Sequence, residues 1–202
     1  MKIIWNGHAC FTLETAEGSV VFDPYEDGSV PGLPPLKLTA DEVLCTHGHG
    51  DHSAADRVTL TGRRPEYTVE VLDTFHDDAG GAKRGPNRMY VISAEGLRVA
   101  HLGDLGCELT ESQVDALRGV DALLIPVGGF FTIDAAAADR TARRVQARVV
   151  IPMHYRSDRF GYDVISGVEG FLALRDDVTV YAGNTLELTK DTPAQTVVLN
   201  CL

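Results

Sequence analysis

The chain has 202 residues, 44% hydrophobic and 23% charged, so it can bury a substantial core and is neither fibrous nor disordered. Its 18 lysines and arginines against 29 aspartates and glutamates give a net charge of −11, which argues against a nucleic-acid partner held through its phosphates. No segment has the roughly 18 uninterrupted apolar residues of a membrane span, and the N-terminus lacks an apolar signal segment. We therefore expect a cytoplasmic protein with no membrane partner.

The first part of the chain predicts an antiparallel β-meander. Short apolar runs separated by turn signals indicate strands at Lys2–Asn6, Cys10–Glu14 and Ser19–Phe22. The segment 26–37 holds three prolines and two glycines and predicts a loop. A short strand, Glu42–Thr46, is expected to run directly into a histidine-rich segment.

The second part of the chain alternates strands with helices, which favours an α/β domain spanning residues 1–202. Expected strands are Tyr67–Leu72, Arg88–Ile92, Leu97–Ala100, Ala122–Pro126, Val149–Ile151 and Val178–Tyr181, with a closing pair of strands at Leu186–Thr189 and Thr196–Leu199. One helix is expected to begin near Ser53. Three further helices are expected at Thr110–Leu117, Asp134–Val145 and Val164–Leu174.

The four cysteines predict no structural cross-link. They lie at positions 10, 45, 107 and 201, with no C-x-x-C pair, in apolar or strand-like segments. A disulfide scaffold or a structural zinc site requires denser or closer cysteines. We expect free thiols in a reducing compartment.

The segment after Glu42–Thr46, His-Gly-His-Gly-Asp-His, carries the strongest chemical signal. His47 and His49, two residues apart in an extended turn, can point to one metal ion, and Asp51 and His52 can point to a second ion nearby. Imidazole and carboxylate together suit zinc, and also manganese, iron or nickel. The spacing predicts a metal centre.

This His-x-His-x-Asp-His pattern resembles the signature of the metallo-β-lactamase fold hydrolases. Further segments resemble the branch that contains L-ascorbate-6-phosphate lactonase, from about residue 3 to residue 188. These segments are Asn6–Phe11, Asp23–Pro24, Arg84–Asn87, His101–Asp104 and Ile151–Tyr155. The resemblance implies a four-layer αββα sandwich. All seven histidines lie in family motifs, His76 in the segment Thr74–Asp77, where this branch keeps a ligand.

The resemblance also implies a set of ligands for two divalent metal ions, zinc being the most typical. It assigns His47, His49 and a later histidine to the first ion, and Asp51, His52 and His154 to the second, with Asp104 as the bridge. The later histidine is His76 or His101, and the branch favours His76, which leaves His101 beside the ligands. His8 has either a role near the site or a structural one. Residues expected beside the ligands or the substrate are His8, His101, Asn87, Thr132 and Tyr155.

Such a ligand set implies hydrolysis by a metal-bound hydroxide, with Asp51 orienting the hydroxide as a catalytic residue. Asp77, Asp56 or backbone carbonyls are expected to hold the outer nitrogens of the ligating imidazoles. Arg84, Arg88, Arg156 and Arg159 either form a local anion pocket or lie solvated on the surface.

The leading hypothesis is therefore a metal-dependent hydrolase of a small-molecule ester, lactone or phosphodiester, with a substrate that carries phosphate if the arginines form a pocket. The alternatives are an iron-dependent redox protein or a non-catalytic metal-binding module on the same fold. The acidic charge disfavours a nuclease, and the missing signal segment disfavours an exported β-lactamase. The sequence is compatible with a monomer or an oligomer.

Overall fold

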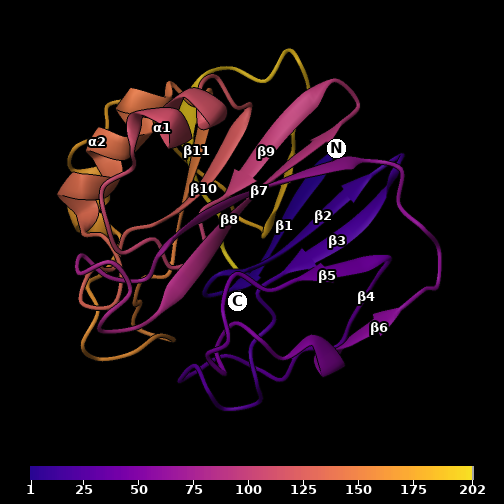
Figure 1. The fold of residues 1–202 in the computed structure, drawn as a ribbon, viewed down its shortest axis with the longest axis horizontal. Coiled ribbons are helices and arrows are strands. Elements are labelled where there is room, and N and C mark those ends of the chain that lie inside the picture. The colour runs from indigo at the N-terminus through magenta and orange to yellow at the C-terminus, as the bar shows by residue number, and fades with distance from the viewer. Residues whose placement is uncertain (202) are drawn as a thin grey trace.

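The computed structural model describes residues 1–201 and contains two large β-sheets, with the α-helices gathered beside the seven-stranded one (Figure 1). One hydrophobic cluster joins the sheets, and Trp5, Phe11 and Phe22 are among its largest fully buried side chains. Truncating such a buried aromatic residue to alanine typically costs about 3–5 kcal/mol. No helix among residues 1–201 is long and apolar enough to cross a membrane.

The five-stranded sheet has the order β13-β1-β2-β3-β5. Its strands are β1 (Lys2–Gly7), β2 (Cys10–Thr15), β3 (Gly18–Phe22), β5 (Glu42–Leu44) and β13 (Thr185–Glu187). The first three pair antiparallel, as the alternating apolar runs predict, and β5 joins β3 in parallel. Two short strands, β4 (Leu38–Ala40) and β6 (Val58–Leu60), pair separately.

The seven-stranded sheet has the order β12-β14-β11-β10-β9-β8-β7. Its strands are β7 (Thr68–Phe75), β8 (Pro86–Ala94), β9 (Leu97–His101), β10 (Ala122–Pro126), β11 (Val149–Met153), β12 (Val178–Val180) and β14 (Gln195–Val198). Pairing is antiparallel among β7, β8 and β9 and parallel from β9 through β12. The parallel strands are nearly all buried, as expected for a sheet covered on both faces.

The helices are α1 (Glu111–Leu117), α2 (Ala135–Val145) and α3 (Glu169–Leu172). Thr110 begins α1 with a capping box, and the Asp134 carboxylate caps α2 by accepting from the backbone N–H of Ala137. The α2 helix packs on β10 and contacts both α1 and α3.

Three expectations about elements are wrong. The helix expected near Ser53 is only a single 3-10 turn, η1 (Ala55–Arg57), followed by the strand β6. The helix expected at Val164–Leu174 shrinks to α3, because glycines at 167 and 170 weaken helical propensity. The two closing strands do not pair with each other: β13 joins β1, and β14 joins β11 and β12. The prediction of free thiols is confirmed at all four cysteines.

Candidate metal centre

The predicted histidines and aspartates come from five separate strand ends that meet at one edge of the two sheets. His8 follows β1, the histidine-rich segment 47–52 follows β5, and His76 follows β7. Asp104 lies three residues after β9, and His154 directly follows β11. The buried strands thus fix where each chain segment leaves the core, and the loops carry the polar side chains.

Two of these histidines have a left-handed backbone, with φ of 52° at both His8 and His154. Non-glycine residues rarely adopt this conformation, and it persists only where the surroundings impose it. The indole N–H of Trp5 donates to the His8 carbonyl at 3.0 Å, and the backbone N–H of His154 donates to the same oxygen at 3.3 Å. These bonds tie β1 to β11 and aim both imidazoles inward.

An outer group consists of His47, His49 and His76, whose donor atoms lie within 4.8 Å of one another. The ring centroid of His47 lies 4.7 Å from the ring centroid of His49 and 4.7 Å from that of His76. His47 is half-buried, His49 is exposed and His76 is buried, so this group reaches the surface.

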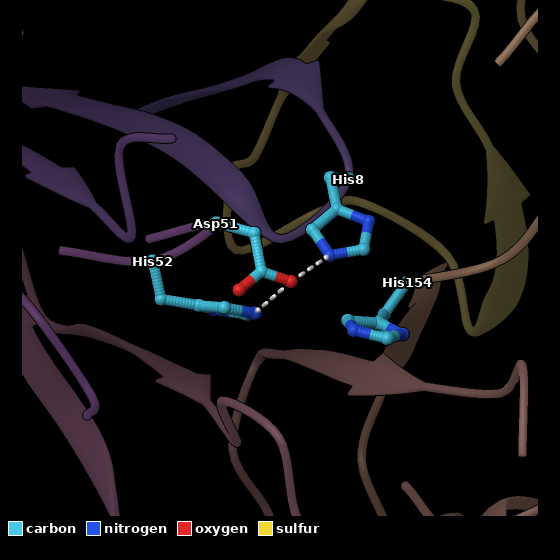
Figure 2. A group of neighbouring side chains, drawn as sticks. All are labelled: His8, Asp51, His52 and His154. Carbon is cyan, nitrogen blue, oxygen red and sulfur yellow. Dashed lines mark hydrogen bonds and ion pairs between the residues drawn. The ribbon is translucent and has the colours of Figure 1, made fainter. Parts of the chain in front are cut away.

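An inner group consists of His8, Asp51, His52 and His154, again with donor atoms within 4.8 Å of one another (Figure 2). The Oδ2 of Asp51 lies 3.2 Å from His8 Nε2 and 3.5 Å from His52 Nε2. The rings of His8 and His154 approach to 4.0 Å between centroids. All three of these histidines are fully buried.

Asp104 lies between the two groups. Its Oδ1 is 3.3 Å from His52 Nε2, and its Oδ2 is 3.3 Å from His76 Nε2 and 3.2 Å from His154 Nε2. Asn87 positions the carboxylate, because its side-chain oxygen accepts the Asp104 backbone N–H at 3.0 Å. Asp104 therefore has the placement that the resemblance implies for a bridging ligand.

Seven buried atoms of this cluster have no hydrogen-bond partner: the Nε2 atoms of His47, His52 and His154, the Nδ1 atoms of His8, His76 and His154, and Oδ1 of Asp104. An unpaired buried polar atom costs about 1–3 kcal/mol. Nitrogen and carboxylate lone pairs that converge within a few ångströms are the donors that divalent transition metals prefer. The residues present therefore fit metal ions at both groups.

Asp23 is a partner that the sequence analysis missed. Its Oδ2 accepts a hydrogen bond from His52 Nδ1 at 2.9 Å, and its carboxylate also accepts from the backbone N–H and hydroxyl of Thr46. It is fully buried, with a left-handed φ of 45°. The expectation that Asp77 or Asp56 holds the imidazoles is wrong; the Asp23–Pro24 motif was the available signal.

Asp77 instead organises the loop that follows His76. Its two carboxylate oxygens accept backbone N–H groups from residues 79, 81, 83 and 84 at 2.7–2.9 Å. Burial opposes ionisation of Asp77, but these four bonds stabilise the carboxylate more strongly and lower the pKa of Asp77 to about 2. The loop is thereby held in one shape between His76 and Arg84.

Burial also sets the protonation of two imidazoles. It lowers the pKa of His8 to about 4, with a further contribution from the nearby His154 charge. It lowers the pKa of His47 to about 4 as well, together with the charge of His52. Both rings are therefore neutral near pH 7 and present a lone pair, as a metal ligand must.

The remaining charges in the centre are coupled. Burial disfavours an ionised Asp104, but the neighbouring His154 and His52 outweigh it and hold the Asp104 pKa well below its ordinary value. Burial likewise opposes a charged His52, but Asp104 and Asp23 raise its pKa well above the ordinary value. The metal-free centre therefore keeps a protonated His52 between two carboxylates.

Three residues expected beside the ligands or the substrate belong to neither donor group. His101 is buried under Phe22 and hydrogen-bonds through its Nε2 to the Ala9 carbonyl at 2.8 Å, outside both donor groups. The Tyr155 ring packs against Trp5 and Phe160, and the Thr132 hydroxyl bonds to the next carbonyl.

A cavity of about 260 Å³ opens over the centre, and it is lined by His49, Asp51, His76, Arg84, Asp104, Phe131 and Tyr162. The sequence analysis missed Phe131 and Tyr162. The Tyr162 hydroxyl lies 3.2 Å from Asp51 Oδ2, and the Arg84 guanidinium lies 5.3 Å from the Phe131 ring centroid. Phe131 directly precedes Thr132, for which the resemblance implies a place beside the substrate, whereas no motif marks Tyr162.

The four arginines do not form one pocket. Arg84 lines the cavity and, with Arg88, a neighbouring groove of about 520 Å³. Arg156 and Arg159 line a different hollow, together with Asp158. The site thus has one cation at its mouth and a second one nearby.

Comparison with known proteins agrees with this architecture. A family model described as the beta-lactamase superfamily domain matches residues 2–154. A UPF0173 metal-dependent hydrolase of Archaeoglobus fulgidus is 31% identical, covering 78% of this chain and 84% of that protein. A second one, from Thermoplasma acidophilum, is 28% identical, covering 90% of this chain and 93% of its own length.

Solved structures give the same picture. A Thermotoga maritima protein assigned to the metallo-β-lactamase superfamily superposes with a TM-score of 0.79 at 36% identity, covering 98% of this chain and 97% of that one. An isothiocyanate hydrolase from Delia radicum gut bacteria shares the fold, with a TM-score of 0.68 at 12% identity over 94% of this chain and 100% of that one. The predicted metallo-β-lactamase fold is confirmed.

Proposed function

The chain belongs to the beta-lactamase superfamily domain family, and from this premise we propose that it is a metal-dependent hydrolase of a small-molecule ester, lactone or phosphodiester. The observation that carries the proposal is the set of unpaired buried donor atoms beneath an open cavity. Its relatives from Archaeoglobus fulgidus and Thermoplasma acidophilum are named metal-dependent hydrolases, which supports the same reaction class.

We propose that the centre holds two divalent cations. The outer group, with His47, His49 and His76, holds one ion; Asp51, His52 and His154 hold the other, and Asp104 is shared. Zinc suits this mixture of imidazole and carboxylate, and manganese, iron and nickel accept the same donors. The chemistry that such cations supply is acidification of a water molecule and polarisation of the oxygen at the bond to be cleaved.

The chain's own residues orient the reactants. Asp51 lines the cavity and stays ionised, because hydrogen bonds with His52 and His8 outweigh burial and hold its pKa below the ordinary value. Its carboxylate can accept a hydrogen bond from the nucleophile. Burial and the Asp51 charge raise the pKa of Tyr162, so this phenol remains a hydrogen-bond donor that steadies Asp51.

The cavity favours a compact substrate that carries negative charge. Within residues 1–201, no carboxylate forms an ion pair with the half-buried Arg84, and Phe130 and Phe131 flank its guanidinium. An arginine held over aromatic rings without an acidic partner is well placed to receive a phosphate or carboxylate. The resemblance to the lactonase branch supports a phosphorylated substrate.

The proposal is tested by counting metal ions on protein purified without chelator, and then by measuring hydrolysis. We expect about two zinc or manganese ions per chain, as a dinuclear centre requires. We also expect hydrolysis that a chelator abolishes, with a higher kcat/KM for the anionic ester 4-nitrophenyl hemisuccinate than for the neutral ester 4-nitrophenyl acetate. Arg84→Gln should reduce this preference, whereas Lys83→Gln should keep it, because Lys83 pairs with Asp78 outside the cavity.

Other outcomes point to the alternatives. Iron bound at the same level, with no hydrolysis of esters, lactones or phosphodiesters, favours the redox protein. Bound zinc without any turnover favours a non-catalytic module.

A further inference from the structure

A groove of about 520 Å³ adjoins the cavity over the metal centre. Its walls come from the histidine-rich segment on one side and from β8 and the ends of its neighbours on the other: Cys45, Thr46, His47, Gly48, His49, Asp73, Arg84, Pro86 and Arg88. Of the outer donor group, His47 lines only the groove, His76 lines only the cavity, and His49 lines both. The outer group therefore stands between two open spaces.

Hydrogen bonds join the two walls of the groove. The backbone N–H of Arg88 donates to the Thr46 carbonyl at 3.0 Å, and the Tyr90 hydroxyl donates to the Cys45 carbonyl at 2.9 Å. Both bonds connect β8 to the segment that follows β5, and so connect one sheet to the other. The separation of the two walls is therefore set by the fold.

Gly48 leaves the groove open along its histidine-rich wall. Its backbone does not have the positive φ that favours glycine. Among residues 1–201, no atom lies within 4 Å of the position that a Cβ would take at Gly48. A larger side chain therefore fits here without strain and would occupy space that the glycine leaves free.

The charges along the groove favour an anionic ligand. Arg84 and Arg88 line it, against the one carboxylate of Asp73. The Nε of Arg88 lies 3.7 Å from Asp73 Oδ1, and the two side chains are 60% and 90% exposed. Such an exposed, long ion pair contributes little, so a carboxylate or phosphate of a ligand can replace Asp73 as the partner of Arg88.

We propose that this groove binds the leaving group of the substrate and prefers a leaving group that carries a carboxylate or phosphate near Arg88. The inference rests on the proposed function for the hydrolysis itself and extends it to a substrate of two parts. Because Asp51 lines the cavity and not the groove, the acid part lies in the cavity. The bond to be cleaved then lies near His49, where the two spaces meet.

The two products then separate into the two spaces. Hydrolysis adds the hydroxyl group of water to the acid part and breaks the bond between the acid part and the oxygen of the leaving group. That oxygen takes up the remaining proton of the water. The acid stays in the cavity, and the alcohol or phenol departs through the groove.

The first test compares the acetate esters of 4-nitrophenol and of 5-hydroxy-2-nitrobenzoic acid, which differ by a carboxylate on the leaving group. After correction for hydrolysis in buffer, zinc-loaded wild type should favour the carboxylated ester in kcat/KM by about tenfold, the effect of one charge-assisted hydrogen bond. Arg88→Gln should abolish this preference. Asp73→Asn should increase it, because Arg88 then has no competing carboxylate.

The matched control is Arg118→Gln. Arg118 is also an exposed arginine paired with an aspartate, Asp115, but it lines neither the cavity nor the groove. This variant should keep the wild-type preference.

Direct binding gives a second readout that does not depend on turnover. Calorimetry compares 5-hydroxy-2-nitrobenzoate, the carboxylated product, with 4-nitrophenol on the zinc-loaded protein. We expect wild type to bind the carboxylated phenol about tenfold more tightly and Arg88→Gln to remove this difference. Gly48→Val should weaken the binding of both phenols by filling the groove, with zinc content measured in parallel to show that the neighbouring histidines still bind metal.

Several results would overturn the inference. They are equal kcat/KM for the two esters together with equal affinity for the two phenols, a preference that survives in Arg88→Gln, or unchanged phenol binding in Gly48→Val. A binding preference that Arg88→Gln removes, without hydrolysis of either ester, would leave the groove assignment standing and refute the hydrolase. Hydrolysis of both esters with no preference in rate or binding would do the reverse.

Discussion

The inner and outer donor groups hold similar residues but are supported in different ways. The inner group is supported by hydrogen bonds from the core: Asp23 accepts from His52, and the Trp5 indole donates to the His8 carbonyl. The outer group is supported by the surface loop after His76, whose backbone N–H groups donate hydrogen bonds to the Asp77 carboxylate. Rigid support in the core suits permanent retention of an ion, whereas a loop at the cavity mouth suits contact with changing ligands.

The largest effect is expected at Asp104, which contacts both groups. Asp104→Asn keeps the size of the side chain but removes the charge that two cations would share. We expect kcat/KM to fall by at least about 10³-fold, in line with the loss of a key electrostatic contact, together with loss of at least one ion per chain. Retention of both ions and of full turnover contradicts the bridging role.

Asp23→Asn should have the next largest effect and should act on the inner group. Removing one partner of a buried, hydrogen-bonded charge pair typically costs about 3–5 kcal/mol, and Asp23 and His52 are both fully buried. We expect Asp23→Asn to lower the free energy of unfolding, measured by urea denaturation, by an amount of this order. The variant should also lose metal more readily on dialysis. A change below 1 kcal/mol would place the support of the inner group elsewhere.

Metal binding should release a proton from the inner group. His52 is protonated in the metal-free centre, and its Nε2 must lose that proton to coordinate an ion. We expect release of about one proton per chain at pH 7, measured by calorimetry in two buffers of different ionisation enthalpy. Equal heats in both buffers would show that His52 is already neutral.

The smallest effect is expected at Asp77, which supports the outer group. Because the Asp77 pKa is depressed to about 2, its contribution to stability is present above the unfolded-state pKa of about 4 and is lost as pH falls through about 2. Asp77→Asn should raise KM for the anionic ester by about tenfold through a loosened loop, with both ions retained. Loss of the inner ion in this variant would erase the distinction between the groups.

The sequence predicts best what depends on local pattern. The continuous apolar runs near 122–126 and 149–151 form strands, and Thr110 and Asp134 cap helices, because apolar runs and capping act over a few residues. The histidine-rich segment also predicts a donor cluster from spacing alone, and the structure places His47, His49, Asp51 and His52 in such clusters.

The sequence predicts poorly what depends on distant partners. The Tyr162 hydroxyl reaches Asp51 across 111 positions of the chain, and no local pattern encodes that meeting. Likewise, β13 and β14 lie a few residues apart but join different sheets, since their pairing partners come from opposite ends of the chain. The sequence alone does not decide the role of His8, because a turn histidine shows its role only when β11 lies beside it.

The left-handed backbone at His8 and His154 also restricts how this centre can evolve. Among substitutions, glycine, asparagine and aspartate tolerate that conformation best. Of these three, only aspartate keeps a strong metal donor, and its oxygens suit manganese or iron better than imidazole does. Drift at these two positions therefore either empties the site or shifts its metal preference while leaving the fold intact, so relatives of this chain can differ in their metal without differing in architecture.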